Sequence, residues 1–232
     1  MPTSFAPLVA GLPATVPFVG PEAQERDRGR PFTARIGANE NVFGPSPRAV
    51  AAMQAAAAGV WQYGDPTNFE LREALSTFLR VPGASIVIGE GVDCLLGLTV
   101  RAFVAPGDRV VTSAGAYPTF NYHVAGFGGE LVTVPYNGDF EDPESLIERA
   151  REVGARLVYI ANPDNPMATY LPADRLQRMI EAAPSDCIIC LDEAYCEFAP
   201  ADALPPLDVD DDRVIRFRTF SKAYGLAGMR VG

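Results

Sequence analysis

Side chains able to do covalent and ionic chemistry follow three apolar runs of the chain. An amide, a carboxylate, a phenol, an amine and a guanidinium occur there, in Asn165, Asp192, Tyr195, Lys222 and Arg230. A lysine amine can form a Schiff base with an aldehyde, and a carboxylate can keep a pyridine nitrogen protonated so that the ring accepts electrons. A guanidinium fits the oxygens of a phosphate. The set favours chemistry on a phosphorylated pyridine aldehyde.

Taken singly, each of these residues has an ordinary structural explanation. Asn165 belongs to a segment with two Asn-Pro pairs, which usually form turns. Asp192 could only cap a helix, and Lys222 could be a solvated charge. The functional interpretation therefore depends on the whole set coming together at one place.

A glycine-containing loop adds a possible anion site. Gly89-Glu90-Gly91-Val92-Asp93 lies between an apolar run and a helical pattern. Backbone N–H groups of such a loop and the helix dipole favour an anion, although an ordinary tight turn has the same composition. A dinucleotide fingerprint is excluded, because Cys94 stands at the place of its third glycine.

Short apolar runs alternate with helical patterns along most of the chain. We predict strands over 85–88, 109–113, 131–135, 157–161, 187–191 and 214–217, and helices over 47–58, 69–79, 93–103, 118–127, 144–153 and 173–183. Ser46 is the expected N-cap of the first helix and Asn68 that of the second. This order predicts an α/β fold, a mostly parallel sheet with helices on both faces. Ligands of such sheets bind beyond the carboxyl ends of the strands.

Composition limits the classes of partner. The 232 residues carry a net charge of −10, which argues against nucleic acid and anionic membranes. Neither a signal peptide nor a membrane-spanning run is recognised, and four cysteines are few, so a cytoplasmic location is expected. Cys187 and Cys190 could be half of a zinc site, but in a strand they point to opposite faces, and no metal is predicted. Residues 1–35 are expected to be an arm with little regular structure, and residues 36–232 one large domain.

Three blocks of the sequence resemble a known family. They are Asn39-Glu40-Asn41, Tyr63-Gly64-Asp65-Pro66, and the segment from Thr219 to Gly232 that contains Ser221-Lys222. Their order is similar to that of the fold type I (class I/II) pyridoxal-phosphate-dependent aminotransferases, and within them to the histidinol-phosphate aminotransferase group. The resemblance runs from about Asn39 to Gly232. It implies the large, cofactor-binding domain of that fold.

The resemblance implies roles for residues around the pyridine ring. Lys222 would carry the cofactor as the Schiff-base lysine, and Asp192 would pair with the ring nitrogen. Asn165 and Tyr195 would hold the ring oxygen. Phe120 would stack on the ring. With Lys222 and Asp192, Tyr195 completes the catalytic set.

The resemblance also implies a phosphate site and a shared active site. The phosphate-binding groups would be Thr219, Ser221, Arg230 and the loop of Gly91, Val92 and Asp93. Tyr63 would reach the phosphate of a neighbouring subunit, which makes a homodimer with shared sites. His123 would either hydrogen-bond Asp192 or be an ordinary helix residue; both remain open.

Two features depart from the family pattern. Ala168 stands where the family often has glycine, which puts the local turn in doubt because alanine is disfavoured at positive φ. The family continues past the position of Gly232 into a small C-terminal domain that carries the substrate-carboxylate arginine, and this part is missing here.

The implied reaction is transfer of an amino group between an amine such as histidinol phosphate and 2-oxoglutarate or glutamate. The alternatives are an aromatic amino acid transaminase, a phospho-amino-acid decarboxylase of the same fold, and a truncated, inactive cofactor-binding fragment. The expected partners are thus a small-molecule amino donor and a 2-oxo acid.

Overall fold

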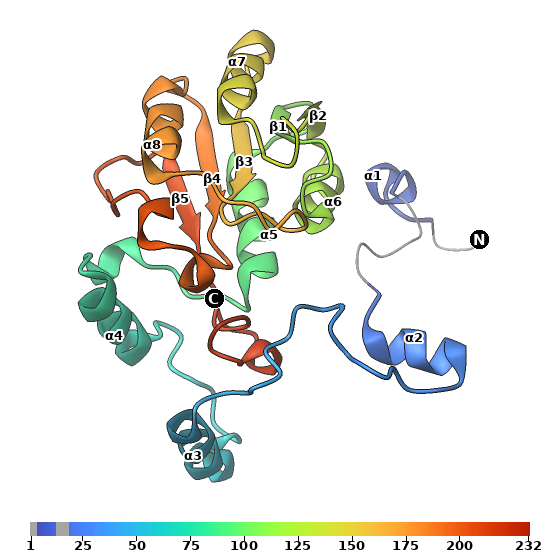
Figure 1. The fold of residues 1–232 in the computed structure, drawn as a ribbon, viewed down its shortest axis with the longest axis vertical. Coiled ribbons are helices and arrows are strands. Elements are labelled where there is room, and N and C mark those ends of the chain that lie inside the picture. The colour runs from blue at the N-terminus through green and yellow to red at the C-terminus, as the bar shows by residue number, and fades with distance from the viewer. Residues whose placement is uncertain (1–3, 13–18) are drawn as a thin grey trace.

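A five-stranded parallel sheet forms the centre of the chain, in the order β2-β1-β3-β4-β5 (Figure 1). The computed structural model describes residues 4–12 and 19–232. The strands are β1 (Arg109–Ser113), β2 (Glu130–Val134), β3 (Leu157–Ala161), β4 (Ile188–Asp192) and β5 (Val214–Phe217). All neighbouring strands pair in parallel. The predicted α/β class with a parallel sheet is confirmed.

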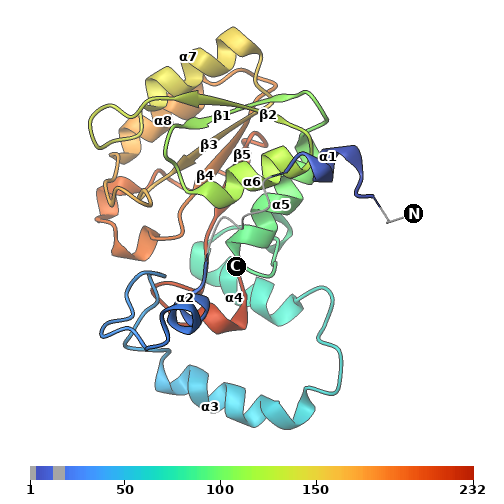
Figure 2. The same ribbon diagram turned by 90° about the vertical axis from the view of Figure 1, so that its right-hand side faces the viewer.

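Helices cover both faces of this sheet, as predicted (Figure 2). On one face lie α5 (Val92–Phe103) and α6 (Pro118–Gly126), and on the other lie α7 (Pro143–Val153) and α8 (Ala173–Ala182). Strand β3 alternates between the two layers. Leu157 and Tyr159 join the core under α5 and α6, whereas Val158 and Ile160 join the core under α7 and α8. This period of two is that of a strand buried on both sides.

The two cysteines considered for zinc separate in the same way. Cys187 packs in the core under α7 and α8, and Cys190 in the core under α5 and α6. Both thiols are free and buried. They lie on opposite faces of the sheet and act as small core residues.

β1 and β3 separate toward their carboxyl ends. This is the point of the sheet where the order of the strands along the chain reverses, because β2 lies on one side of β1 and β3 on the other. β1 pairs with β3 at Val110–Val111, and beyond these residues Glu141 lies between the two strand ends. Its carboxylate accepts hydrogen bonds from Ser113 Oγ and from the N–H of Ala161, the latter at 2.8 Å. Glu141 is fully buried, and this burial raises its pKa to about 7. Crevices of this kind, between diverging strand ends, are where parallel sheets bind ligands.

Helix α3 begins as the sequence predicts. It spans Pro47–Ala56 and continues as a 3-10 turn over Ala57–Gly59. The Ser46 hydroxyl accepts the N–H of Ala49 at 3.2 Å, which is the expected N-cap.

Helix α4 spans Phe69–Leu79, the predicted range, and Asn68 occupies the predicted N-cap position. Asn68 has left-handed backbone angles and its side chain makes no capping bond. Asp65 instead accepts the N–H of Phe69 at 2.9 Å and that of Thr67 at 2.9 Å. The predicted N-cap position is therefore confirmed, but the side-chain oxygen that accepts the first N–H of the helix belongs to Asp65.

The strand predicted over 85–88 is wrong. Gly83–Ser85 forms a 3-10 turn, and Ile86 then adopts extended angles without entering the sheet. Gly89 exchanges two backbone hydrogen bonds with Gly232, at 3.0 and 3.1 Å. The segment has the extended backbone of a strand, but a strand assignment requires a paired neighbour over several residues.

The N-terminal arm contains more regular structure than predicted. Short helices α1 (Pro7–Ala10) and α2 (Pro21–Arg28) lie beside the sheet domain (Figure 1). Each begins with proline at its first position, which is favourable there. Pro21 is the one buried residue of the two helices. Within the two described ranges, we find no helix with the length and apolar character needed to cross a membrane.

Candidate active site

The carboxyl ends of the strands border a cavity of about 520 Å³. Loops after β1, β3, β4 and β5, the start of α5, and residues 37–40 form its walls. Nine of the predicted site residues line it: Val92, Asp93, Asn165, Asp192, Tyr195, Thr219, Ser221, Lys222 and Arg230. Residues from five separate parts of the sequence thus come together at one edge of the sheet, as the fold class predicts.

Asp192 is the buried anion of this cavity. It ends β4 and is 7% exposed. Tyr159 Oη donates to its Oδ2 at 2.8 Å, and the N–H of Ala194 donates to its Oδ1 at 3.0 Å. Burial raises the pKa of Asp192, and these two hydrogen bonds oppose the rise because they stabilise the charged form.

Lys222 projects into the cavity from the loop after β5. Its Nζ donates to the carbonyl oxygens of Ala38 and Asn39, at 3.2 and 3.4 Å. Burial lowers the pKa of Lys222, and the positive charge of Arg230 lowers it further. Lys222 is also the single lysine of the chain, since the other 18 of its 19 basic residues are arginines. A partly desolvated amine of lowered pKa is what a nucleophilic lysine requires.

The segment of residues 37–40 reaches the cavity from the N-terminal part of the chain. Asn39 Nδ2 donates to Tyr195 Oη at 3.0 Å, and two residues on Asn41 Nδ2 donates to the carbonyl oxygen of Ala223 at 2.9 Å. Burial raises the pKa of Tyr195, so the phenol keeps its proton. A Cβ at Gly225 would lie 2.5 Å from the backbone of Gly44, so only glycine permits this close approach.

The opposite end of the cavity is suited to an anion. The first hydrogen bond within α5 runs from Leu95 N–H to Gly91 O, so the amides of Val92 and Asp93 precede it at the helix N-terminus. Arg230 Nη2 donates to the carbonyl oxygen of Glu90 at 3.2 Å and so lies against this turn. Thr219 and Ser221, both buried, add hydroxyl groups.

Gly91 supports this end without lining it. It has φ of 86°, and a Cβ built there would lie 2.5 Å from Arg230 Nη2. The absent side chain is therefore what lets the guanidinium lie across the turn.

His123 does not contact Asp192. Its Nε2 lies 2.9 Å from Asp93 Oδ1, which lowers the pKa of Asp93. A Cβ at Gly97 would lie 2.9 Å from the imidazole ring, so glycine leaves room for the histidine against α5. Of the two interpretations, hydrogen bonding to Asp192 is therefore wrong, and Tyr159 takes that place.

The turn after Asn165 keeps its shape without glycine. Ala168 has φ of 58°, the left-handed region in which alanine is disfavoured. Its N–H donates to the carbonyl oxygen of Asp164 at 3.2 Å, and the Asp164 N–H donates to that of Thr169 at 2.9 Å. These bonds hold the turn closed, and Asn165 still lines the cavity.

Two other predicted residues lie away from the lining. Phe120 is fully buried and stacks on Tyr159, with ring centroids 4.4 Å apart and an interplanar angle of 15°. Tyr117, the N-cap residue of the same helix α6, does line the cavity. Tyr63 is fully exposed. Its reach into a neighbour's site and the stacking role of Phe120 stay predictions.

Sequence reasoning missed several residues of the lining. They include Tyr117, Thr119, Tyr159 and the segment Gly37, Ala38, Asn39 and Glu40. Tyr159 carried a usable signal, because a tyrosine in a fully buried strand needs a partner for its hydroxyl. The segment of residues 37–40 carried no such signal beyond its resemblance to the family. No local pattern places it beside Lys222, which is far away in the sequence.

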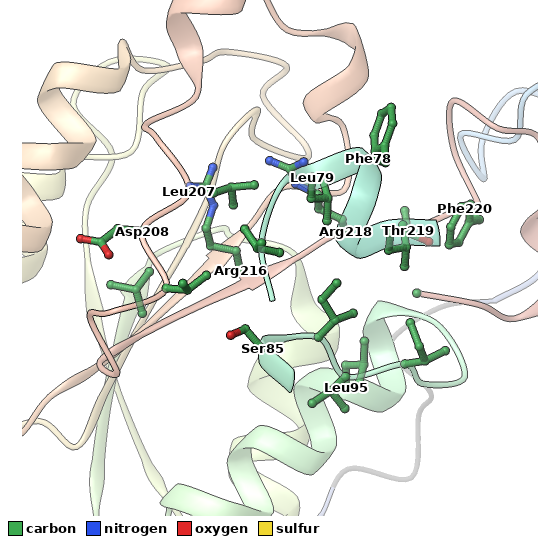
Figure 3. A pocket seen from close by; sticks show the side chains of 18 of the residues that line it. Phe78, Leu79, Ser85, Leu95, Leu207, Asp208, Arg216, Arg218, Thr219 and Phe220 are labelled. Carbon is green, nitrogen blue, oxygen red and sulfur yellow. The ribbon is translucent and has the colours of Figure 1, made fainter. Parts of the chain in front are cut away.

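A second cavity, of about 390 Å³, lies beside β5, an edge strand of the sheet, between this strand and helices α4 and α5 (Figure 3). Phe78 and Leu79 of α4 and Leu95 of α5 border it, with Arg216 and Arg218 on the β5 side. Both arginines are already paired with the buried carboxylate of Glu193. This groove is mainly apolar and lacks the convergent reactive groups of the first.

Comparisons with known proteins agree on one family. A family model described as aminotransferase class I and II matches residues 34–232. The histidinol-phosphate aminotransferase of Anaeromyxobacter sp. (strain Fw109-5) is 38% identical over 229 residues, which cover 97% of this chain and 63% of that protein.

Solved structures give the same picture. The chain matches the crystal structure of histidinol-phosphate aminotransferase from Sinorhizobium meliloti in complex with pyridoxal-5'-phosphate, with a TM-score of 0.94 and 55% identity, over 98% of this chain and 61% of that one. An aspartate aminotransferase from Thermus thermophilus with maleate matches with a TM-score of 0.84 and 22% identity, over 99% of this chain and 64% of that one, and shares the fold alone. The chain spans about three fifths of the length of these relatives.

Proposed function

Because the chain belongs to the class I and II aminotransferase family, we propose that it is the cofactor-binding part of a pyridoxal-phosphate-dependent aminotransferase. The amino donor is an amine such as histidinol phosphate and the acceptor is 2-oxoglutarate. The observation that carries the proposal is the convergence of Lys222, Asp192, Tyr195 and Arg230 on one cavity. The names of the relatives support the substrate.

The residues present fit the proposed cofactor. A site for pyridoxal phosphate needs an amine, a carboxylate and an anion cradle within one cavity. Lys222 and Asp192 supply the first two, and the α5 N-terminus with Arg230 supplies the third. The space that a side chain at Gly91 would fill is taken by the Arg230 guanidinium. The charge at each end is thus opposite to that of the group it would hold.

When bound, the cofactor supplies an aldehyde that condenses with an amine and a ring that accepts electrons. Lys222 Nζ would be the amine that holds it, and the lowered pKa of Lys222 keeps more of this amine unprotonated. With the cofactor and substrate bound, the free Lys222 amine would be the base that moves the proton. Asp192 would keep the ring nitrogen protonated, and Tyr195 and Asn165 would orient the ring oxygen.

The test of this proposal uses the single lysine. The chain is incubated with pyridoxal phosphate, reduced with borohydride and digested, and the labelled peptide is identified by mass spectrometry. We expect a visible absorption band and a label on Lys222. The matched control is Lys222→Arg, which keeps the charge and leaves no side-chain amine. A label on the N-terminal amine alone, or none, would contradict the proposal.

The substrate is tested on the same protein. Histidinol phosphate should convert the visible band of the loaded chain faster than aromatic amino acids do. A preference for phenylalanine or tyrosine would transfer the proposal to an aromatic aminotransferase.

We also propose that the protein forms a homodimer with shared active sites. We further propose that it is located in the cytoplasm. Val60, Trp61 and Tyr63 lie close together in the sequence and are between 79% and 104% exposed, and exposed apolar side chains of this kind favour a protein contact. Four free thiols fit a reducing compartment. Light scattering on the purified chain tests the dimer, and Tyr63→Ser should weaken it.

A further inference from the structure

The hydroxyl of Tyr159 lies in the core between the sheet and helices α5 and α6, where it contacts Asp192. Tyr159 is fully buried on β3, and its Oη donates to Asp192 Oδ2 at 2.8 Å. The Tyr159 ring stacks on Phe120, which is itself fully buried. Two packed aromatic rings leave the phenol little rotational freedom. Core packing therefore fixes the position of this donor.

Asp192 receives one donor on each carboxylate oxygen. Tyr159 bonds Oδ2 and the N–H of Ala194 bonds Oδ1. A carboxylate has about four lone-pair directions, so both oxygens can accept a further proton donor. Two donors on different oxygens fix the plane of the carboxylate, and the cavity side remains available.

The charged and titratable groups around Asp192 come from all the neighbouring elements. They are Tyr159 and Cys190 on the strands, and Glu141, Glu193, Tyr195 and Lys222 in the loops. Burial and the negative Glu193 favour the neutral acid, whereas Tyr159, the Ala194 amide and Lys222 favour the anion. Burial also holds the pKa of Tyr159 well above its ordinary value, so its phenol stays a donor.

We propose that Tyr159 is a positioning residue of the active site: its hydroxyl orients the Asp192 carboxylate and keeps it ionised toward the cofactor ring nitrogen. This inference rests on the proposed function. Tyr159 acts through Asp192, and nothing in its role requires contact with the substrate. Its effect is therefore on the charge state and direction of Asp192.

The test is the Tyr159→Phe variant, which removes one oxygen and keeps the stacked ring. Removing the donor raises the pKa of Asp192, so the variant loses the anion at higher pH than the wild type. We expect the affinity for pyridoxal phosphate near neutral pH to fall about tenfold, since hydrogen bonds to charged groups are of this order. The low-pH limit of the visible band should move up by about one pH unit.

Tyr136→Phe is the matched control. Tyr136 Oη donates to Asp164 at 3.1 Å, and Asp164 does not line the cavity. This control should leave the affinity and the pH limit unchanged. Equal effects of the two variants would overturn the inference.

A double-mutant cycle with Asp192→Asn completes the test. Tyr159→Phe should have no further effect on the pH limit in that background, because the titrating carboxylate is gone. A persisting shift would overturn the inference. Failure of the wild-type chain to bind the cofactor would instead refute the proposed function, so the two failures are distinguishable.

Discussion

The two walls of the cavity are built in different ways. The strand-end wall consists of residues that follow β3, β4 and β5, and Asp192, Thr219 and Ser221 in it are buried. The segment wall consists of residues 37–40, and its neighbours Ile36 and Phe43 are 73% and 94% exposed. The sheet core positions the first wall, whereas side-chain hydrogen bonds hold the second. Substitutions at the buried groups of the strand-end wall should therefore strongly reduce cofactor binding or catalysis. Substitutions in the segment wall should reduce them only slightly.

The largest effect should come from the strand-end wall, at Asp192. We expect Asp192→Ala to bind cofactor through the phosphate groups but to slow proton abstraction from the substrate by at least about a thousandfold, because the ring loses its counter-charge. Single-turnover spectroscopy with histidinol phosphate measures this rate. Near-normal turnover would remove Asp192 from the proposed role.

Glu141, which bridges the ends of β1 and β3 behind this wall, tests the sheet that supports it. Its carboxyl has a pKa of about 7 in the folded chain and an ordinary value of 4.5, so the folded state binds more protons between these values. The free energy of unfolding must then decrease as the pH rises from about 4.5 to 7. Glu141→Gln mimics the protonated acid, and at pH 8 it should raise the free energy of unfolding by up to about 3 kcal/mol.

Denaturant unfolding at pH 4 and pH 8 measures this slope. At pH 4 the wild type and Glu141→Gln should be equally stable, because Glu141 is protonated in both folded and unfolded chains. The control is Glu144→Gln. Glu144 is exposed and bonded to Arg175, which lowers its pKa, so this variant should gain nothing at pH 8. A gain shared by both variants would refute the assignment to burial.

A smaller effect is expected at the anion end. The Cβ of Gly91→Ala would displace the Arg230 guanidinium, and the affinity for pyridoxal phosphate should fall by about tenfold, the loss of one charged contact. Gly138→Ala is the control, because Gly138 also has positive φ but nothing lies within 4 Å of a Cβ there. Both variants carry a backbone cost at positive φ, larger at Gly91 because φ of 86° with ψ of 168° is a glycine-only region, and only the first should lose affinity in a fluorescence titration.

The difference between the walls also explains what the sequence could predict. Strands, their alternation and the residues at their ends follow from local patterns, so Asp192 and Lys222 were predicted and lie together. Tyr159 was missed because an apolar strand hides a single hydroxyl. Asn39 was missed because its bond to Tyr195 spans 156 residues and is set by the tertiary fold. Residues 85–88 have the sequence pattern of a strand, but they do not form one. A strand also requires a neighbouring strand to pair with, and local sequence does not reveal this.

The smallest effect should come from the segment wall, at Asn39. Asn39 donates to Tyr195 Oη and has φ of 53°, so Asn39→Gly removes the donor and suits the left-handed backbone. Tyr195 keeps its ring in place but loses the bond that orients its hydroxyl. We expect the affinity for pyridoxal phosphate to fall only about threefold, less than for Gly91→Ala, which corresponds to about 0.7 kcal/mol for one hydrogen bond at a partly exposed site.

The matched control for this change is Asn68→Gly. Asn68 has a similar φ of 49° and makes no side-chain capping bond, so the backbone effect is the same and no contact with the cavity is lost. Fluorescence titration of both variants isolates the side-chain bond from the backbone. If Asn39→Gly lost as much affinity as Gly91→Ala, the segment wall would be as tightly coupled to the cofactor as the strand-end wall. The contrast between the two walls would then fail, because polar contacts across 156 residues would position the site as firmly as the sheet does.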